Sequence, residues 1–360
     1  MWCPPSADDS QKKWTCSLST IEAPRTVVTG LASERRSMEV LRGGVETTVQ
    51  DYPGRLGYWD IGIPPSGPLD DYSLRVANLL VGNAPGEAAL EVTAGMFSVK
   101  ARSDLVLAVT GADMQPTLGV RPVPMWESFL SKEGDVLSLR IAGTTGFRAY
   151  IAVAGGIDVP SYLGSRSTFA AGGFGGFEGR VLKPSDLLKV GSSERTPSEL
   201  VGRKARDGVI PRFAKTIEVE ATVGPQAAPD FVSEDDLEAF FSEVHRVDRN
   251  ANRLGYRLSP RQWRWARPDG GIAGKHPSNI IDNGYTVGSV NISGDQPIIL
   301  MRDGPSAGGF ICLCCVVTGS LWKVGQAAPG RDKLKFKKVS YDEAIQLRRG
   351  LERNLQTGIR

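Results

Sequence analysis

The sequence contains few of the residues from which metal and disulfide sites are built. Among 360 residues there are only two histidines and five cysteines. None of the cysteines lies near a histidine in the sequence, and three of them fall in one apolar run: they are Cys3, Cys16, Cys312, Cys314 and Cys315. We therefore expect no metal site and no disulfide framework, and we interpret the cysteines as buried or bystander residues.

Long apolar runs and an excess of charge of one sign are also missing. No apolar run approaches the roughly 20 residues that a membrane-spanning helix requires. The 43 basic and 40 acidic residues leave a net charge of only +3. Residues 1–15 lack the basic-then-apolar order of a secretory signal. The sequence thus predicts a cytoplasmic protein that binds neither nucleic acid nor a membrane.

Glycine and proline, by contrast, are abundant and separate short apolar runs. The 42 Gly and 23 Pro favour a mainly β fold with tight turns, and the spacing of the runs is that of a sandwich or barrel. Strands are expected within residues 38–44, 47–54, 89–93, 97–101, 104–111, 136–141, 148–156, 216–224, 297–301 and 311–317.

A few short helices are expected among these strands. Residues 68–82 carry apolar side chains at helical spacing behind Asp70, which we interpret as a helix cap. A second helix should begin at Ser233, and a third should cover residues 341–355. The Gly-rich stretch 169–179 does not have the spacing of a dinucleotide-binding loop. We interpret it as a loop near the active face that needs backbone freedom, with a plain surface linker as the alternative.

The composition also suggests where the chain divides. Residues 1–37 are polar and unperiodic, so we expect a disordered or divergent leader. A polar and basic stretch before residue 214 separates two expected subdomains, 38–213 and 214–345, and residues 346–360 would form a C-terminal helix or tail.

Several separated motifs, taken in order, resemble one known family. They are QDYPGRLGYW (50–59), PSGPLD (65–70), ANLLVGN (77–83), GSRSTF (164–169), 224–231, 250–255, 265–270, HPSN (276–279), 303–306 and 321–323. This series is similar to the carboxyltransferase domain (A/B region) of urea carboxylase, the biotin-dependent half of urea amidolyase. The same family includes the C-type subunit of bacterial 5-oxoprolinase. The resemblance covers about residues 38–341.

The resemblance implies a fold and an activity. The fold would be two β-barrel-like (cyclophilin-like) subdomains, and the reaction would be transfer of the carboxyl group from carboxybiotin to urea, giving allophanate. The motifs resemble the urea carboxylase branch more than the 5-oxoprolinase branch. Ile281 and the run Leu313-Cys314-Cys315 depart from the pattern of that branch.

Parts of such an enzyme are missing from the sequence. It contains no phosphate loop ending in Lys-Ser/Thr and no Met-Lys-Met biotinylation site. We therefore expect a separate carrier domain to present biotin and a separate biotin carboxylase domain to use ATP, with a second carboxyltransferase region as a further partner. Activity of this chain alone is not expected. The alternatives are a C-type subunit that hydrolyses 5-oxoproline with partner subunits, or a non-catalytic truncated fragment.

Residues 50–70 form the first loop of the expected site. Its Pro and Gly residues would fix a rigid backbone close to a small planar ligand, and its polar side chains would surround that ligand. We expect Asp51 and Arg55 to be catalytic, although an ion pair that pins the loop explains them equally well. The residues expected to bind the cofactor are Gln50, Tyr58, Ser66, Gly67, Ser165 and Ser167.

A second loop, residues 278–283, has the densest polar cluster of the second half. We expect Asn279 and Asp282 to be catalytic there, and Ser278 and Asn283 to bind substrate. His276 is a weaker candidate for a general base. The two loops would then face each other across the subdomain boundary and build one pocket.

Two further substrate-binding residues are expected outside these loops, each with a structural alternative. Asn78 would line the pocket or bond to a neighbouring loop. Arg253 would bind a carboxyl group or close a turn. His245 is interpreted as structural.

Overall fold

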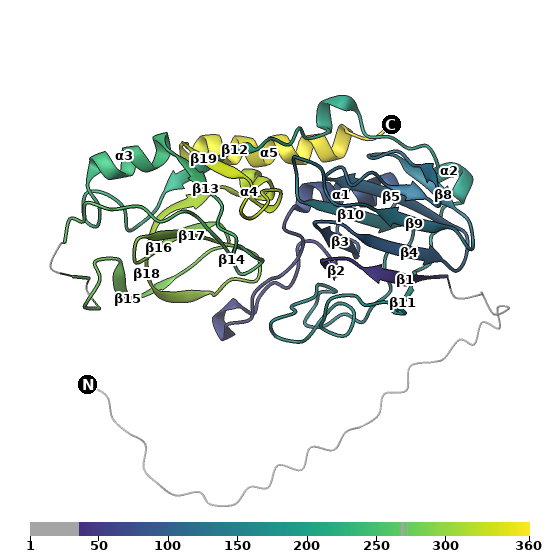
Figure 1. Ribbon diagram of the computed structural model, residues 1–360, viewed down its shortest axis with the longest axis horizontal. Coiled ribbons are helices and arrows are strands. Elements are labelled where there is room, and N and C mark those ends of the chain that lie inside the picture. The colour runs from purple at the N-terminus through teal and green to yellow at the C-terminus, as the bar shows by residue number, and fades with distance from the viewer. Residues whose placement is uncertain (1–35, 268–269, 272) are drawn as a thin grey trace, which may run out of the picture. The chain divides into compact units, whose positions relative to one another are not determined.

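The computed structural model describes residues 36–267, 270–271 and 273–360 (Figure 1). The expected leader lies outside the described residues except for its last two positions, and Ser37 already belongs to the first strand. In the described part of the chain, no helix has both the length and the apolar character needed to cross a membrane.

The fold is mainly β, as the sequence predicts, and the first half of the chain forms two sheets. The six-stranded sheet has the order β11-β1-β4-β9-β6-β7, and the five-stranded sheet has the order β2-β3-β10-β5-β8. The strands are β1 (Ser37–Gly43), β2 (Glu46–Gln50), β3 (Ala89–Thr93), β4 (Phe97–Ala101), β5 (Leu105–Gly111), β6 (Thr117–Leu118), β7 (Arg121–Pro122), β8 (Ser128–Ser131), β9 (Val136–Leu139), β10 (Arg148–Val153) and β11 (Leu187–Lys189).

Strand β5 explains how this half is layered. All seven of its residues are buried. Leu107 and Val109 point into the core between the two sheets, whereas Val106 and Ala108 point to the other face and pack with α1 (Asp71–Leu80). A strand that is covered on both faces has no polar alternation, which is why residues 105–109 form one continuous apolar run.

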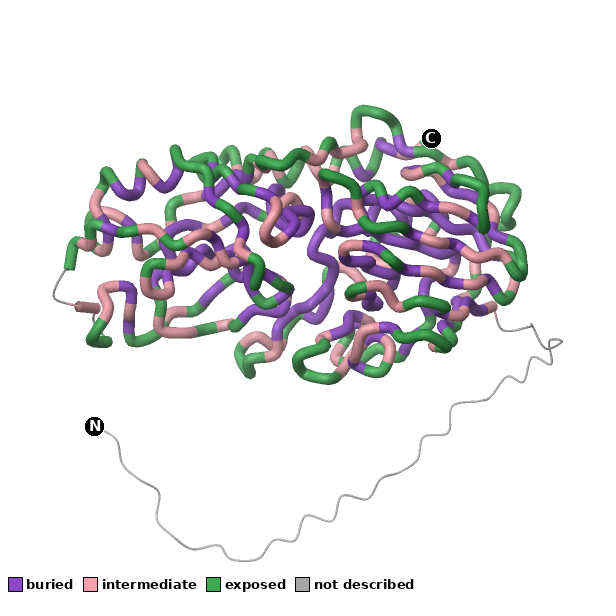
Figure 2. The backbone as a smooth tube through the Cα atoms, viewed as in Figure 1, coloured by how far each residue is buried: buried purple, intermediate pink, exposed green. Residues whose placement is uncertain are grey.

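Helix α1 begins where the sequence predicts it. Asp70 Oδ1 accepts a hydrogen bond from the backbone N–H of Ser73 at 2.9 Å, which confirms Asp70 as the helix cap. The chain is buried continuously from Pro64 to Asn78, and Figure 2 shows a buried stretch of tube near the centre of the molecule. The first loop is therefore fixed at its C-terminal end by burial as well as by helix capping.

The second half forms a third sheet around a separate apolar core. Its order is β13-β19-β12-β18-β16-β17-β14, with β15 paired to β18. All pairs are antiparallel except β12 with β19. The strands are β12 (Thr216–Val223), β13 (Val244–Arg246), β14 (Gly255–Arg257), β15 (Asn279–Gly284), β16 (Ser289–Ser293), β17 (Gln296–Leu300), β18 (Ala307–Val316) and β19 (Lys333–Lys338).

Short helices complete the fold. The Ser233 hydroxyl caps α3, as expected, and Ser340 caps the C-terminal helix α5. Helix α5 runs without a break across residues 345 and 346 and bonds to α1 through Glu352 and Arg75. The helices are η1 (Trp59–Ile61), α1 (Asp71–Leu80), α2 (Pro197–Leu200), η2 (Asp207–Val209), α3 (Glu234–Ser242), α4 (Thr318–Gly325) and α5 (Tyr341–Thr357).

Candidate active site

The carboxylate of Asp51 is the centre of a hydrogen-bonded turn. It follows β2 and accepts hydrogen bonds from the hydroxyls of Ser165 and Ser167, each at 2.5 Å. It also accepts one from the backbone N–H of Arg166 at 2.7 Å. Three residues predicted for the site thus meet, although 114 positions separate Asp51 from Ser165. Asp51 fixes the shape of the Ser165–Ser167 turn.

The side chain of Arg55 lies against this turn and is 1% exposed. Its Nε donates to the carbonyl of Tyr162 at 3.3 Å, and its Nη2 donates to the carbonyl of Ser167 at 2.9 Å. The guanidinium also covers the ring of Phe174. Burial lowers the pKa of Arg55, and the nearby charge of Asp51 opposes that shift. Arg55 therefore bonds to backbone carbonyls rather than pairing with Asp51, and its Nη1 is buried without a partner among the described residues.

Gln50 and Gly67 hold the two ends of the first loop together. The Gln50 side chain is fully buried, donates to the carbonyl of Thr168 and accepts from the Gly67 N–H at 3.0 Å. Gly67 has φ +90°, and a Cβ there would lie 3.2 Å from the Asp51 carbonyl oxygen. Ser66 is also fully buried, and its hydroxyl has no partner within the described residues. The Gln50 amide thus already donates within the protein, whereas the Ser66 hydroxyl does not.

Tyr58 lies near the tip of the same loop and is half-buried. It precedes η1, and its carbonyl accepts a hydrogen bond from the N–H of Ile63 at 3.0 Å. The indole Nε1 of the neighbouring Trp59 is buried and has no partner in the described part of the chain. The first loop thus contains three buried donors without partners, on Arg55, Trp59 and Ser66.

The Gly-rich loop packs directly on Arg55. Gly175 has φ +73°, and a Cβ on it would lie 2.2 Å from the Ser167 carbonyl oxygen and 2.6 Å from Arg55 Nη2. A cavity of about 460 Å³ opens beside this contact, with Tyr162, Phe174 and Gly175 among its lining residues. The contact requires glycine, as the sequence predicts for a loop that needs backbone freedom.

Arg253 is engaged in a buried ionic network rather than being free to bind a ligand. Its Nη1 lies 2.6 Å from Glu91 Oε1, its Nε lies 2.8 Å from Asp303 Oδ2, and its Nη2 donates to the Gly67 carbonyl at 2.7 Å. The Arg253 side chain is 6% exposed. Burial raises the pKa of Glu91, but Arg253 and Arg148 outweigh it and hold that pKa below its ordinary value. The expected contact between Arg253 and substrate does not fit this geometry, because every nitrogen of the guanidinium already donates to the protein.

Asn78 is also a structural residue in this arrangement. It is fully buried in α1, and its Nδ2 donates to the carbonyls of Pro85 and Glu87, the second at 2.7 Å. Its Oδ1 accepts from Asn83 Nδ2 at 3.0 Å. Because its amide is fully used and buried, we correct the expected substrate contact to the bond with a neighbouring loop.

The second loop belongs to a separate hydrogen-bond network, and the structure corrects its expected loop conformation, because Asn279–Gly284 form strand β15 paired to β18. Ser278 Oγ lies 2.9 Å from His276 Nδ1, and Asn279 donates to the Gly274 carbonyl. Asn283 Nδ2 donates to Gln226 Oε1 at 3.3 Å. The carboxylate of Asp282 is exposed and accepts from the N–H of the residue that follows it. None of these hydrogen bonds reaches the first loop. Within the described residues, the two loops are therefore not joined by the direct hydrogen bonds of these side chains, and the expected shared pocket has no support from them.

The two histidines have different surroundings. His245 is buried, its Nε2 lies 2.8 Å from the Phe240 carbonyl oxygen, and burial lowers its pKa. This confirms its structural interpretation. His276 is half-buried, and its Nε2 lies 3.8 Å from Asp295. Within the described residues, no group of three or more His, Cys, Asp or Glu side chains is arranged to hold a metal ion.

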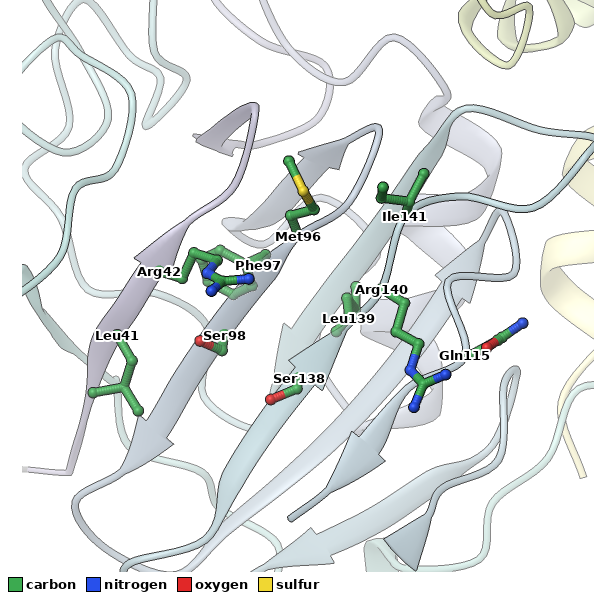
Figure 3. Close-up of a pocket in the computed structure, with 10 residues that line it drawn as sticks. All are labelled: Leu41, Arg42, Met96, Phe97, Ser98, Gln115, Ser138, Leu139, Arg140 and Ile141. Carbon is green, nitrogen blue, oxygen red and sulfur yellow. The ribbon is translucent and has the colours of Figure 1, made fainter. Parts of the chain in front are cut away.

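A larger cavity lies away from all of these residues. It measures about 770 Å³ and opens on β1, β4 and β9, where Figure 3 shows its lining side chains. Leu41 and Met96 are partly exposed there beside Arg42 and Arg140. This lining includes no carboxylate and no residue expected from the sequence to belong to the site, so size alone does not identify the candidate site.

Sequence reasoning missed the residues that connect the first loop to the second half. Arg302 Nη1 donates to the Pro53 carbonyl, and the Arg302 carbonyl accepts from the Ser66 N–H at 2.9 Å. Asp303 anchors Arg253. The motif 303–306 is part of the family resemblance, and this is the signal that could have drawn attention to Asp303 and its neighbour.

Sequence comparisons with known proteins all find members of one family. The family model "Carboxyltransferase domain, subdomain A and B" matches residues 61–338. Urea amidolyase from Saccharomyces cerevisiae is 44% identical over 88% of this chain and 17% of its own length. The C-type subunit of 5-oxoprolinase from Escherichia coli is 34% identical over 88% of this chain and 96% of its own length.

A solved structure agrees with the same family. The urea carboxylase of Kluyveromyces lactis is 42% identical and superimposes with a TM-score of 0.84 over 89% of this chain and 29% of that one. The chain thus spans less than a third of urea carboxylase and less than a fifth of urea amidolyase, but nearly all of the C-type subunit of 5-oxoprolinase.

Proposed function

Because the chain belongs to the family of carboxyltransferase domains with subdomains A and B, we propose that it is the carboxyltransferase portion of a biotin-dependent urea carboxylase. Its reaction is the transfer of a carboxyl group to urea to give allophanate. The observation that carries the proposal is the 44% identity to urea amidolyase over 88% of the chain. The proposed limits of the two subdomains are 38–213 and 214–345. The second limit falls inside α5, so residues 346–357 of the expected C-terminal helix or tail belong to that helix.

The reaction requires donors for an oxygen that gains negative charge. Such donors each contribute about 3–4 kcal/mol when they are fixed in a pocket that excludes water. Arg55 Nη1 and Ser66 Oγ are buried donors of this kind, and both are without partners among the described residues. A buried donor without a partner costs free energy, so a ligand that accepts from it binds favourably. We assign Arg55 and Ser66 to ligand binding.

Other residues of the first loop hold these two in place. Asp51 fixes the Ser165–Ser167 turn, whose last carbonyl accepts from Arg55, and Gln50 bonds to Gly67 beside Ser66. They are positioning residues in this proposal, because their polar groups are already used within the protein. Preorganisation of this kind lowers the cost of orienting the reactants.

The residues present fit the biotin ring system. The cavity beside Arg55 has aromatic walls at Tyr162 and Phe174 and measures about 460 Å³, within the usual range for small-molecule sites. Tyr162 and Phe174 would hold the flat ureido ring there. When bound as carboxybiotin, the cofactor supplies the carboxyl group. Tyr58, at the tip of the loop, is a further proposed contact.

Other domains complete the enzyme in this proposal. A biotin carboxylase domain uses ATP, a carrier domain presents biotin, and a second carboxyltransferase region adds to the site, all in the cytoplasm. Their need is supported by the small share of urea amidolyase that the chain covers. Asn279, Asp282, Ser278 and Asn283 remain predictions for substrate contact, but their network is separate from the first loop.

The second candidate function is that of the C-type subunit of a 5-oxoprolinase. The specific observation in its favour is length, because the chain covers 96% of the Escherichia coli protein. In that case the same first loop would act on 5-oxoproline together with other subunits.

A reconstitution experiment separates these functions. The full chain is added to a Saccharomyces cerevisiae urea amidolyase from which the matching region has been deleted, and ADP formation is measured with bicarbonate and either urea or 5-oxoproline. We expect urea-dependent ADP formation from the mixture and none from either component alone. The matching yeast region, added in the same way, is the positive control.

Two results contradict the proposal. One is a mixture that stays inactive although the yeast region restores activity. The other is a chain that instead restores 5-oxoproline hydrolysis to an Escherichia coli 5-oxoprolinase lacking its C-type subunit, which supports the second candidate. If an Arg55→Met variant still restores the urea reaction fully, the proposed role of Arg55 is wrong, although the proposed function of the chain still holds.

A further inference from the structure

Strand β18 contains an irregularity that brings two cysteines together. Its pairing with β16 matches Cys312 to Asn291 and Cys315 to Ser289, so the strand has one extra residue between them. In a regular strand, residues three positions apart point to opposite faces. The bulge therefore turns Cys312 and Cys315 to the same face, and their Sγ atoms lie 3.6 Å apart.

The cysteines of this strand are expected from the sequence to be buried or bystander residues, and the C-x-x-C spacing of Cys312 and Cys315 was missed. The three thiols of the strand do not have the same surroundings. Cys315 is partly exposed, whereas Cys312 is 2% exposed and Cys314 is fully buried. Only Cys315 is therefore open to a reagent from solvent.

The pKa shifts of the three thiols parallel their exposure, because the pKa is lowered only for the partly exposed Cys315. The hydrogen bond between Cys312 and Cys315 lowers the pKa of Cys315 to about 7, although burial raises it, and the hydroxyls of Ser289 and Thr286 add to the lowering. The same bond to Cys315, together with burial, raises the pKa of Cys312. Burial raises the pKa of Cys314. Cys315, the partly exposed thiol, is thus also the one that most readily forms the nucleophilic thiolate.

We infer that Cys312 and Cys315 form a dithiol site that a small disulfide, such as oxidised glutathione, converts reversibly into an intramolecular disulfide. The inference does not depend on the proposed carboxyltransferase activity. It assigns a modification site to a part of the chain where the sequence departs from the urea carboxylase pattern.

The chemistry takes two exchange steps. The Cys315 thiolate attacks one sulfur of oxidised glutathione, forms a mixed disulfide and releases one glutathione thiolate. The Cys312 thiol then loses its proton and attacks Cys315 Sγ, which forms the internal bond and releases the second glutathione. Two protein thiols are oxidised, and one small disulfide is reduced to two thiols. The two Sγ atoms need only move from 3.6 Å to the bonded distance of about 2.05 Å.

The site lies beside the second loop. The Cys312 N–H donates to Gln226 Oε1 at 3.0 Å, and the same oxygen accepts from Asn283 Nδ2 at 3.3 Å. A change at Cys312 therefore acts on a residue that is bonded directly to Asn283.

The test is thiol mapping of the full chain. The folded protein is incubated with oxidised glutathione, then unfolded, alkylated with N-ethylmaleimide and digested with trypsin. All three cysteines of β18 fall in the peptide 303–323, whereas Cys3 and Cys16 fall in other peptides. We expect this peptide to lose the mass of two hydrogen atoms and to carry one label, on Cys314. Dithiothreitol before alkylation should restore three labels.

Two variants give matched controls. In Cys314→Ser the disulfide should still form, and the peptide should carry no label. In Cys312→Ser the second exchange has no attacking thiol, so glutathione should stay on Cys315. Three labels in the oxidised wild type, stable glutathione on its Cys315, or a disulfide that includes Cys314 would each overturn the inference. The wild-type labelling pattern decides the question even if a variant fails to fold.

Discussion

Arg253 Nη1 lies 2.6 Å from Glu91 Oε1, although 162 positions separate the two residues in the chain. Glu91 is on β3 in the first half, and Arg253 precedes β14 in the second. Both are buried, and Asp303 completes the network from the segment after β17. The same guanidinium donates to the Gly67 carbonyl. Arg253, from the second half, therefore holds both β3 and the first loop of the first half.

The first prediction concerns this network. Arg253→Ala leaves two buried carboxylates, Glu91 and Asp303, without this cation, and we expect the free energy of unfolding to fall by about 3–5 kcal/mol. Denaturant unfolding measures it. The control is Arg102→Ala, which removes an exposed partner of Glu39 and should cost less than about 1 kcal/mol. Equal losses in the two variants would contradict the role of Arg253.

The second prediction concerns Asp51. Asp51→Ala removes the acceptor of three hydrogen bonds, so we expect it to lower the free energy of unfolding by about 1–3 kcal/mol and to abolish urea-dependent ADP formation in the reconstituted mixture. Asp51→Asn keeps one oxygen as an acceptor for Ser165 and Ser167 and should retain part of the activity. Asp60→Ala changes an exposed carboxylate of the same loop and should behave as wild type. A fully active Asp51→Ala would exclude Asp51 as a positioning residue.

Local patterns were sufficient to predict much of the fold. The continuous apolar run 105–109 and the cap at Asp70 each depend only on residues that are close in the sequence, and the structure has β5 and α1 at these places. The partners of Asp51 and Arg253 depend instead on which strands pair, and no local pattern specifies that. Ser165 and Ser167 entered the candidate site through the family resemblance alone. The bulge that joins Cys312 to Cys315 is likewise set by the register of β16 on β18.

The third prediction tests the contact between the Gly-rich loop and Arg55. Gly175→Ala places a Cβ 2.2 Å from the Ser167 carbonyl oxygen and 2.6 Å from Arg55 Nη2, so the loop must move. We expect loss of activity in the reconstituted mixture together with lower stability. Gly202 has a similar φ of +85° but open space around its Cβ, and it lies outside the cavity beside Arg55. Gly202→Ala should therefore cost only the backbone strain of about 1–2 kcal/mol and keep activity. Equal activity in the two variants would contradict a functional contact at Gly175.

The fourth prediction concerns pH and Asp70. Burial raises its pKa from 3.8 to about 7, although hydrogen bonds from Ser73 and Gln326 oppose the shift. The folded protein therefore binds this proton more tightly than the unfolded chain does, so the contribution of Asp70 to stability falls as pH rises from about 4 to 7 and is constant above that.

Asp70→Asn does not titrate. We expect the free energy of unfolding of the wild type to decrease relative to Asp70→Asn across this window, by at most about 4 kcal/mol. Denaturant unfolding at a series of pH values measures the difference. The variant also changes the contact with Gln326, which shifts this difference in free energy by an amount that does not depend on pH. Only the change of the difference with pH therefore reports the titration of Asp70. A difference that stays constant across the window would show that Asp70 is ionised in the folded protein throughout.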